Sequence, residues 1–223
     1  MTTRLDLYNN ALLVCGERFL ASLTEDREPR RLLDHVWNTG GNNFVLEQGQ
    51  WHFAMRAVMI DYDPSISPAF GLQKAFTKPS DWVLTSAVCS DEYFKVPILG
   101  YAFEANDWYC DLTPIYVKYV SNDAAYGTDL SRWPQTFTDY VAAYYASKII
   151  GKLAGDRAAQ LLKLFGPPGA PNSGLLMQTL HKAKQAAAFT QPTQFPAQGN
   201  WTRARLGSRG GYNDRGNTGG LIG

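Results

Sequence analysis

Residues 133–153 read WPQTFTDYVAAYYASKIIGKL, and this stretch decides the fold. Proline suits the first turn of a helix, because backbone N–H groups there have no intrahelical partner. After Pro134, the residues Phe137, Val141 and Tyr144 recur at helical spacing. We therefore expect a long buried helix that ends near Gly155, with an apolar face widened by Tyr140, Tyr145, Ile149 and Leu153.

Two shorter helices are predicted after this one. Asp156 can cap the first, whose buried edge we expect at Leu161, Leu162 and Phe165. A rigid connector, Pro167–Pro171, precedes the second. Ser173 can cap that last helix, in which the small and apolar residues Leu176, Leu180, Ala183 and Ala187 recur on one face.

Before the long helix, the chain begins with a helix predicted from Leu5 to Gly16. Gly16 suits the left-handed residue that ends many helices. Thr24 can cap a second helix that continues to about residue 50, but Gly40-Gly41 interrupts it. Two glycines cost about 2 kcal/mol relative to alanine in a helix interior. Either the helix breaks there or a neighbouring backbone approaches closely.

Between the two helical segments, short extended pieces are expected. Residues 51–55 alternate as a strand does, and residues 115–120 have the highest strand propensity. Residues 101–112 read as a hairpin with the two-residue turn Asn106-Asp107. The prediction is an α+β fold, mainly α. It consists of a helical bundle (about residues 5–50 and 134–189) with an inserted small antiparallel β region (about 51–132).

The last 33 residues, 191–223, lose all periodicity and hold eight glycines and four arginines. Such a stretch cannot bury enough apolar surface to offset its ordering entropy. We therefore predict a domain over residues 1–190 and an extended C-terminal arm over 191–223. One Arg-Gly-Gly in the arm is reminiscent of RNA-binding segments, whereas its isolated Trp and Tyr favour docking on a protein.

Composition narrows the class of protein. Residues 1–190 hold 17 basic and 19 acidic side chains, a balance that argues against a dedicated duplex-binding surface. Three cysteines without a C-x-x-C pattern predict reduced, buried thiols. The chain shows neither a signal-peptide pattern nor an apolar run of 18 residues, so we expect no membrane contact.

No recognised catalytic or cofactor motif is found in the sequence. The histidines are isolated and are interpreted as surface or strand-edge residues: His35, His52 and His181. The acids around the hairpin, Glu104, Asp107 and Asp111, are interpreted as turn-forming and solubilising. We predict no enzyme, no cofactor and no metal site.

Aromatic residues are concentrated in the middle of the chain, with 20 of the 29 between Trp51 and Tyr145. They can stack nucleic-acid bases or form a core and a subunit interface. The scarcity of Lys and Arg in this stretch favours the second interpretation. The predicted subunit or tail interface consists of Trp108, Tyr109, Tyr116 and Tyr119.

The order of several motifs resembles the tail tubular protein A and head-to-tail adaptor family of tailed bacteriophages. The resemblance covers roughly residues 5–165. It rests on Cys15-Gly16-Glu17, Arg27, Arg31, Leu32-Leu33, Trp51-x-Phe53-Ala54, Pro79-x-Asp81-Trp82-Val83, the aromatic hairpin and Trp133-Pro134-x-x-Phe137. The long region from Asp61 to Lys95 exceeds a minimal adaptor of this kind.

This resemblance implies a structural protein of the virion neck, assembled in the host cytoplasm. Twelve copies would form a ring under the dodecameric portal, extend the DNA channel without reading sequence, and bind the next tail component, a nozzle or tail tube protein. The arm would reach the portal, and our hypothesis for its contacts is Trp201, Arg203, Arg205, Arg209 and Tyr212. The alternative is an RNA-binding protein with an RGG-like arm.

Overall fold

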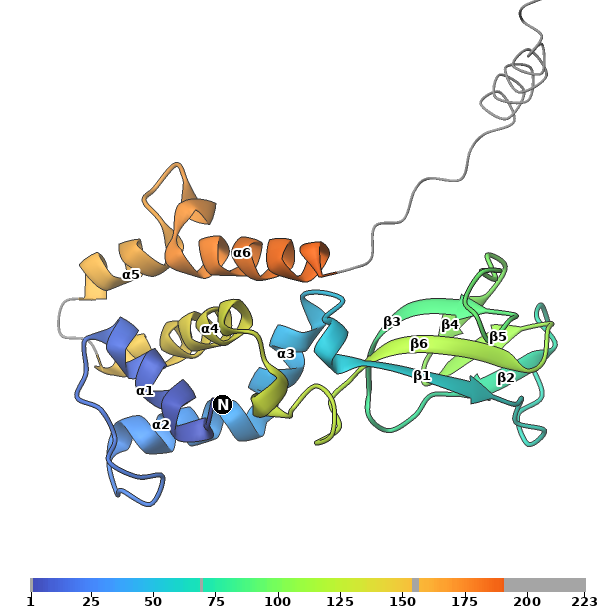
Figure 1. Cartoon of the computed structure of the whole chain (residues 1–223), viewed down its shortest axis with the longest axis horizontal. Coiled ribbons are helices and arrows are strands. Elements are labelled where there is room, and N and C mark those ends of the chain that lie inside the picture. Colours follow the sequence, from blue (N-terminus) through green and yellow to red (C-terminus); the bar gives the residue numbers. More distant parts are fainter. Residues whose placement is uncertain (1, 69, 154–156, 191–223) are drawn as a thin grey trace, which may run out of the picture. The chain divides into compact units, whose positions relative to one another are not determined.

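The computed structural model of the chain describes residues 2–68, 70–153 and 157–190. All the described helices and strands belong to the unit Met1–Phe189, with helices at both ends of this unit and strands between them (Figure 1). The fold is α+β and mainly α, as predicted. The predicted arm and its five proposed contact residues lie outside the described residues.

The helix predicted after Trp133 is the centre of the helical part. This helix, α4 (Gln135–Leu153), buries residues on most of its circumference. The Pro134 carbonyl accepts hydrogen bonds from the N–H groups of Phe137 and Thr138, both at 3.0 Å. The prediction of a long buried helix is confirmed, with Pro134 just before its first residue.

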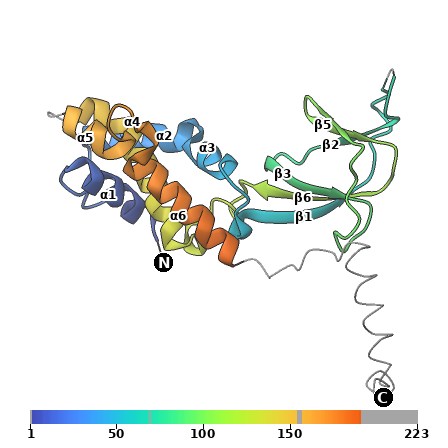
Figure 2. The same ribbon diagram turned by 90° about the horizontal axis from the view of Figure 1, so that it is seen from above.

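The other helices pack around α4 or against its neighbours (Figure 2). Thr3 caps α1 (Arg4–Cys15) in a capping box with Asp6, and Gly16 ends it at φ 74°. The prediction of this helix is confirmed. α2 (Glu28–Val36) begins after Arg27 rather than at Thr24, because Pro29 occupies its first turn and fixes the backbone there.

The two adjacent glycines break the second helix, which was the first of the two alternatives. A single π-turn, Trp37–Gly41, separates α2 from α3 (Asn42–Glu47), and Gly40 has φ 87°. A Cβ atom on Gly41 would lie 2.5 Å from the Val36 carbonyl oxygen and 3.1 Å from the Tyr145 ring. Gly40 is thus required for its backbone angle, and Gly41 for space.

The last two helices exist, but two details of their prediction are wrong. In α5 (Arg157–Phe165) the buried residue is Leu164, while Leu161, Leu162 and Phe165 are 39–46 % exposed. α5 therefore packs against the rest of the protein along one side, at Leu164. α6 (Leu175–Phe189) is not capped by Ser173, whose hydroxyl donates instead to the Ala170 carbonyl within a short 3₁₀ turn.

The β region consists of two antiparallel three-stranded sheets. One has the order β1 (Met55–Ile60), β6 (Ile115–Ser121), β3 (Trp82–Cys89). The other has the order β2 (Lys74–Thr77), β5 (Asp107–Cys110), β4 (Ala102–Glu104). Their facing side chains form one apolar cluster, and the indole N–H groups of Trp82 and Trp108 both donate to the Thr85 hydroxyl.

The strand prediction is right at residues 115–120 and wrong at 51–55. Residues 52–54 form a 3₁₀ turn, because the Trp51 indole is buried against Phe137 and donates to the carbonyls of Val45 and Leu46. The hairpin is confirmed, but its turn is Ala105-Asn106, one residue earlier than predicted. Within the described residues, no helix is long and apolar enough to cross a membrane.

Candidate protein-binding surface

Three loops gather at the end of the β region where β1, β3 and β5 end. They are residues 61–73, 90–101 and 111–114, which we call the tip. The pairs Ile60–Ile115 and Cys89–Tyr116 place the first two loops beside the start of β6. The pair Lys74–Cys110 places the third loop beside the end of the first. Loops far apart in the sequence therefore meet at one surface.

The tip exposes large apolar side chains. Phe70 and Leu99 are each 90 % exposed, and Tyr93 is 71 % exposed. Four more large apolar side chains of the tip are exposed: Tyr62, Val96, Tyr101 and Leu112. Single exposed apolar residues are common on protein surfaces, but a group of them rimmed by polar residues marks a binding surface.

The backbones of these loops are held in place by hydrogen bonds from their N–H groups to aspartate carboxylates. The Asp91 carboxylate accepts from the N–H groups of Lys95 and Val96 at 2.8–3.1 Å, and the bond from Lys95 contributes most to lowering the pKa of Asp91. Asp111 accepts from the Gln73 N–H at 2.8 Å, which ties two loops together. The apolar side chains therefore stand on loops with defined backbones.

The tip is also acidic. It contains five carboxylates and one ammonium group, that of Lys95, which gives a net charge of −4. Next to it, a hollow of about 440 Å³ lies between residues 66–72 and the hairpin of β4 and β5. Tyr109 and Glu104 line its hairpin side, and Phe70 its loop side. A partner with apolar and basic side chains would match this surface.

A partly buried carboxylate, Asp81, joins the strands that support the tip. Asp81 accepts hydrogen bonds from the Arg56 guanidinium at 2.9 Å, from the Tyr119 hydroxyl at 3.0 Å and from the Ser121 hydroxyl. Burial alone would raise the pKa of Asp81, but these hydrogen bonds outweigh it and hold the pKa below its ordinary value. The carboxylate thus links β1, β6 and the start of β3.

A buried lysine, Lys78, fixes the hairpin. The Lys78 ammonium donates to the Ala105 carbonyl at 2.8 Å and lies 3.8 Å from the centre of the Phe103 ring and 4.3 Å from that of Trp82. Burial lowers the pKa of Lys78, while the nearby Asp107 carboxylate raises it. The lysine closes the turn by a hydrogen bond and two cation–π contacts.

The interface predicted from aromatic residues needs correction. Trp108 and Tyr119 are completely buried between the sheets, so they are core residues. Tyr109 lines the hollow and Tyr116 is partly exposed, and for these two the interface stays a prediction. Sequence reasoning missed Phe70 and Leu99. A usable signal was present, since large apolar residues beside glycine in a loop have no strand to bury them.

The described residues offer little that suits catalysis or metal binding. No cluster of three or more His, Cys, Asp or Glu side chains suited to a metal occurs in residues 2–68, 70–153 and 157–190. Cys15, Cys89 and Cys110 are buried thiols, and burial raises the pKa of Cys15 to about 11. At such a pKa the thiol is protonated at neutral pH and reacts poorly as a nucleophile.

No protein-family model matches the chain, and no curated protein matches it in sequence.

Proposed function

We propose that the chain is a structural protein of a tailed-phage virion. It forms a ring that joins the portal to the next tail component and extends the channel through which DNA is ejected. The observation that supports this most is the tip, an apolar and acidic surface on loops with defined backbones. The order of sequence motifs described above supports the same function.

The physical properties of the tip suit assembly better than chemistry. Protein interfaces use large apolar and aromatic side chains in contact with a partner, surrounded by polar groups. Phe70, Tyr93 and Leu99 have this character. Their loops are held by aspartate hydrogen bonds, so a partner would meet a preorganised surface with little ordering entropy to lose.

The charge of the chain is consistent with a conduit. A net charge of −2 over residues 1–190 gives no overall attraction to phosphate, so DNA could slide past without strong retention. In this proposal the chain assembles in the host cytoplasm and needs no cofactor. Modest contacts, repeated around a ring, would give strong attachment through avidity.

The test is reconstitution with the portal and the next tail component of the same virus. The full chain should bind both, and electron microscopy should show a ring under the portal. Deletion of residues 195–223 should abolish portal binding and leave the remaining domain folded. A Lys118→Glu variant, at an exposed position on β6 outside the tip, is the control for the deletion and should keep portal binding. A chain that binds neither component, but binds single-stranded RNA tightly at low salt, would overturn the proposal.

A further inference from the structure

Within the described residues, the lysines of the C-terminal helices form no ion pair. Residues 140–190 contain five lysines and one arginine but only one acid, Asp156. All five lysines are exposed: Lys148, Lys152, Lys163, Lys182 and Lys184. Every ion pair in the described part of the chain uses an arginine from residues 4–132, and none uses a lysine. These ammonium groups are available to an anionic partner.

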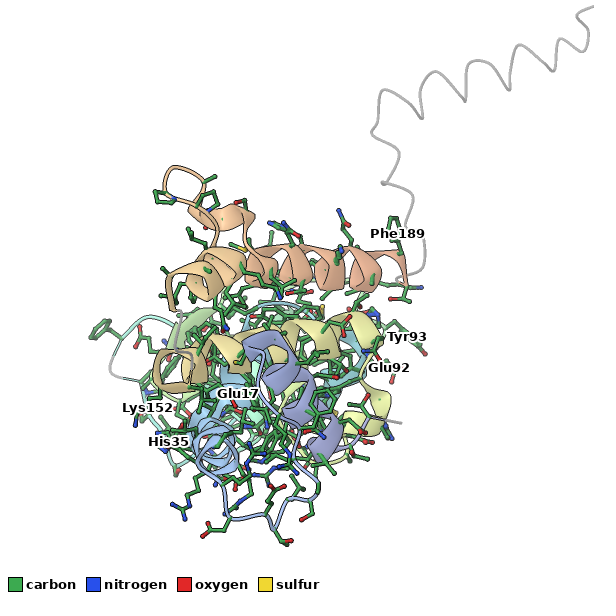
Figure 3. The ribbon with its side chains drawn as sticks, turned by 90° about the vertical axis from the view of Figure 1, so that its left-hand side faces the viewer. Glu17, His35, Glu92, Tyr93, Lys152 and Phe189 are labelled. Carbon is green, nitrogen blue, oxygen red and sulfur yellow. The ribbon has the colours of Figure 1, made fainter. Side chains whose placement is uncertain are left out.

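One of these lysines, Lys148, lines an apolar groove of about 350 Å³. It is lined by α3, α4, α6 and the end of α5, chiefly through Phe44, Tyr144, Phe165, Leu176, Met177 and Leu180. The Phe44 ring stacks on Tyr144 at 4.7 Å, and the Lys148 ammonium lies 5.2 Å from the centre of the Tyr144 ring. We call this surface the lysine groove. Lys152, also labelled in Figure 3, follows Lys148 one turn later on α4.

The lysine groove and the tip have complementary properties. Both expose large apolar side chains, but the groove is lined by the cation Lys148, with Lys152 one turn later on α4, and the tip has a net charge of −4. We propose that the lysine groove of one copy binds the tip of a second copy. This inference rests on the proposed ring and identifies the two surfaces that build it. Because the surfaces differ, the contact is heterologous, and such a contact builds a ring when the rotation from one copy to the next closes.

The apolar lining favours a protein over nucleic acid as the occupant. A duplex would pair its phosphates with the lysines but would leave Phe44, Phe165 and Leu176 uncovered. The exposed apolar residues Leu161 and Leu162 on α5 would also stay in water. The acidic and apolar tip satisfies both kinds of group, since ion pairs at the rim set orientation while apolar side chains supply contact area.

Charge reversal on each surface tests the inference. The variant Lys148→Glu/Lys152→Glu and the variant Asp61→Lys/Glu92→Lys should each weaken self-association of the full chain about tenfold or more, measured by sedimentation velocity. Combining all four changes in one chain should restore it. Lys118→Glu, an exposed reversal on β6 outside both surfaces, is the matched control and should leave self-association unchanged.

An apolar pair of variants supplies an independent test. Leu99→Ser should weaken self-association, whereas Phe189→Ser, at 87 % exposure outside both surfaces, should not (Figure 3). Circular dichroism should show that both variants are folded. Unchanged self-association in the reversal variants overturns the inference. A wild-type chain that stays monomeric also overturns it, and so do lysine variants that lose DNA binding but keep self-association. Portal binding by the same variants tests the proposed function separately, since a ring built through other surfaces would keep it.

Discussion

Large apolar residues are buried in the helical part but exposed at the tip. In the helical part, α4 is surrounded by neighbours, and residues such as Val141 and Tyr145 are completely buried. At the tip, residues of similar size, Phe70 and Leu99, are 90 % exposed. The comparison indicates that the helical part supplies stability and that the tip supplies contact area. Substitutions should therefore have very different effects in the two places.

The largest difference is expected between two aromatic truncations. Trp51→Ala removes a side chain that is 2 % exposed and lies 4.7 Å from the Phe137 ring, so it should lower the free energy of unfolding by about 4 kcal/mol. Phe70→Ala removes an exposed ring and should change it by less than about 0.5 kcal/mol. Urea denaturation measures both. Similar losses in the two variants would contradict the division between stability and contact.

The Asp81 carboxylate joins the strands that carry the tip, so a substitution there tests how those strands are stabilised. Asp81→Asn should destabilise the protein by about 3 kcal/mol, because Arg56, Tyr119 and Ser121 lose their common anionic acceptor. Since the folded-state pKa is lowered, this stabilisation is present above the ordinary carboxyl pKa of about 4 and is lost as the pH falls through the folded-state pKa.

Denaturation at pH 7 and pH 3 checks the role of Asp81. The wild-type protein should lose more stability between the two pH values than the Asp81→Asn variant does. Asp61→Asn is the control, because this exposed carboxylate lies in the tip, at the opposite end of β1 from the Arg56 that Asp81 binds. An equal pH dependence in wild type and Asp81→Asn would mean that other carboxylates dominate.

The glycine pair separates two causes of destabilisation within the helical part. Gly41→Ala should cost about 2 kcal/mol, because the new Cβ would collide with the Val36 carbonyl and the Tyr145 ring. Gly40→Ala meets no atom within 4 Å and should cost about 1 kcal/mol, from the positive φ alone. Thermal unfolding of both variants tests this order, and the reverse order would refute the steric explanation.

The smallest effect is expected at the turn of the hairpin. Ala105 has φ 46°, a region in which glycine is favoured over residues with a side chain. Ala105→Gly should therefore stabilise the protein by about 0.5 kcal/mol, measured by denaturation. Ala102→Gly, within β4, is the matched control and should destabilise it. Destabilisation by Ala105→Gly would show that the turn is not strained.

The helices were predictable where one local signal dominated. The periodic apolar residues of α1 and α4, with Gly16 and Pro134 at their ends, determine those helices without help from distant residues. The turn at residues 52–54 was not predictable, because Trp51 packs into a core built by residues almost 90 positions later. Local alternation there was overridden by tertiary contact.

The candidate surface was harder to predict for a related reason. Strand propensity placed Trp108 and Tyr119 in the β region but could not say that their side chains face the opposite sheet. The tip depends on strand register, which brings three loops together only after the sheets have formed. The portal-binding experiment tests the arm as a whole, since the deletion of residues 195–223 removes both Trp201 and Tyr212.

The two indoles that donate to the Thr85 hydroxyl should give the β region a distinct circular dichroism signal. The rings of Trp82 and Trp108, which both donate to that hydroxyl, lie 6.4 Å apart at an interplanar angle of 84°. Two indole chromophores at this separation couple excitonically, so their ultraviolet circular dichroism should contain a couplet that neither ring produces alone. The couplet should disappear when the two sheets separate, whether or not the helical part stays folded. It therefore reports the opening of the β region in real time.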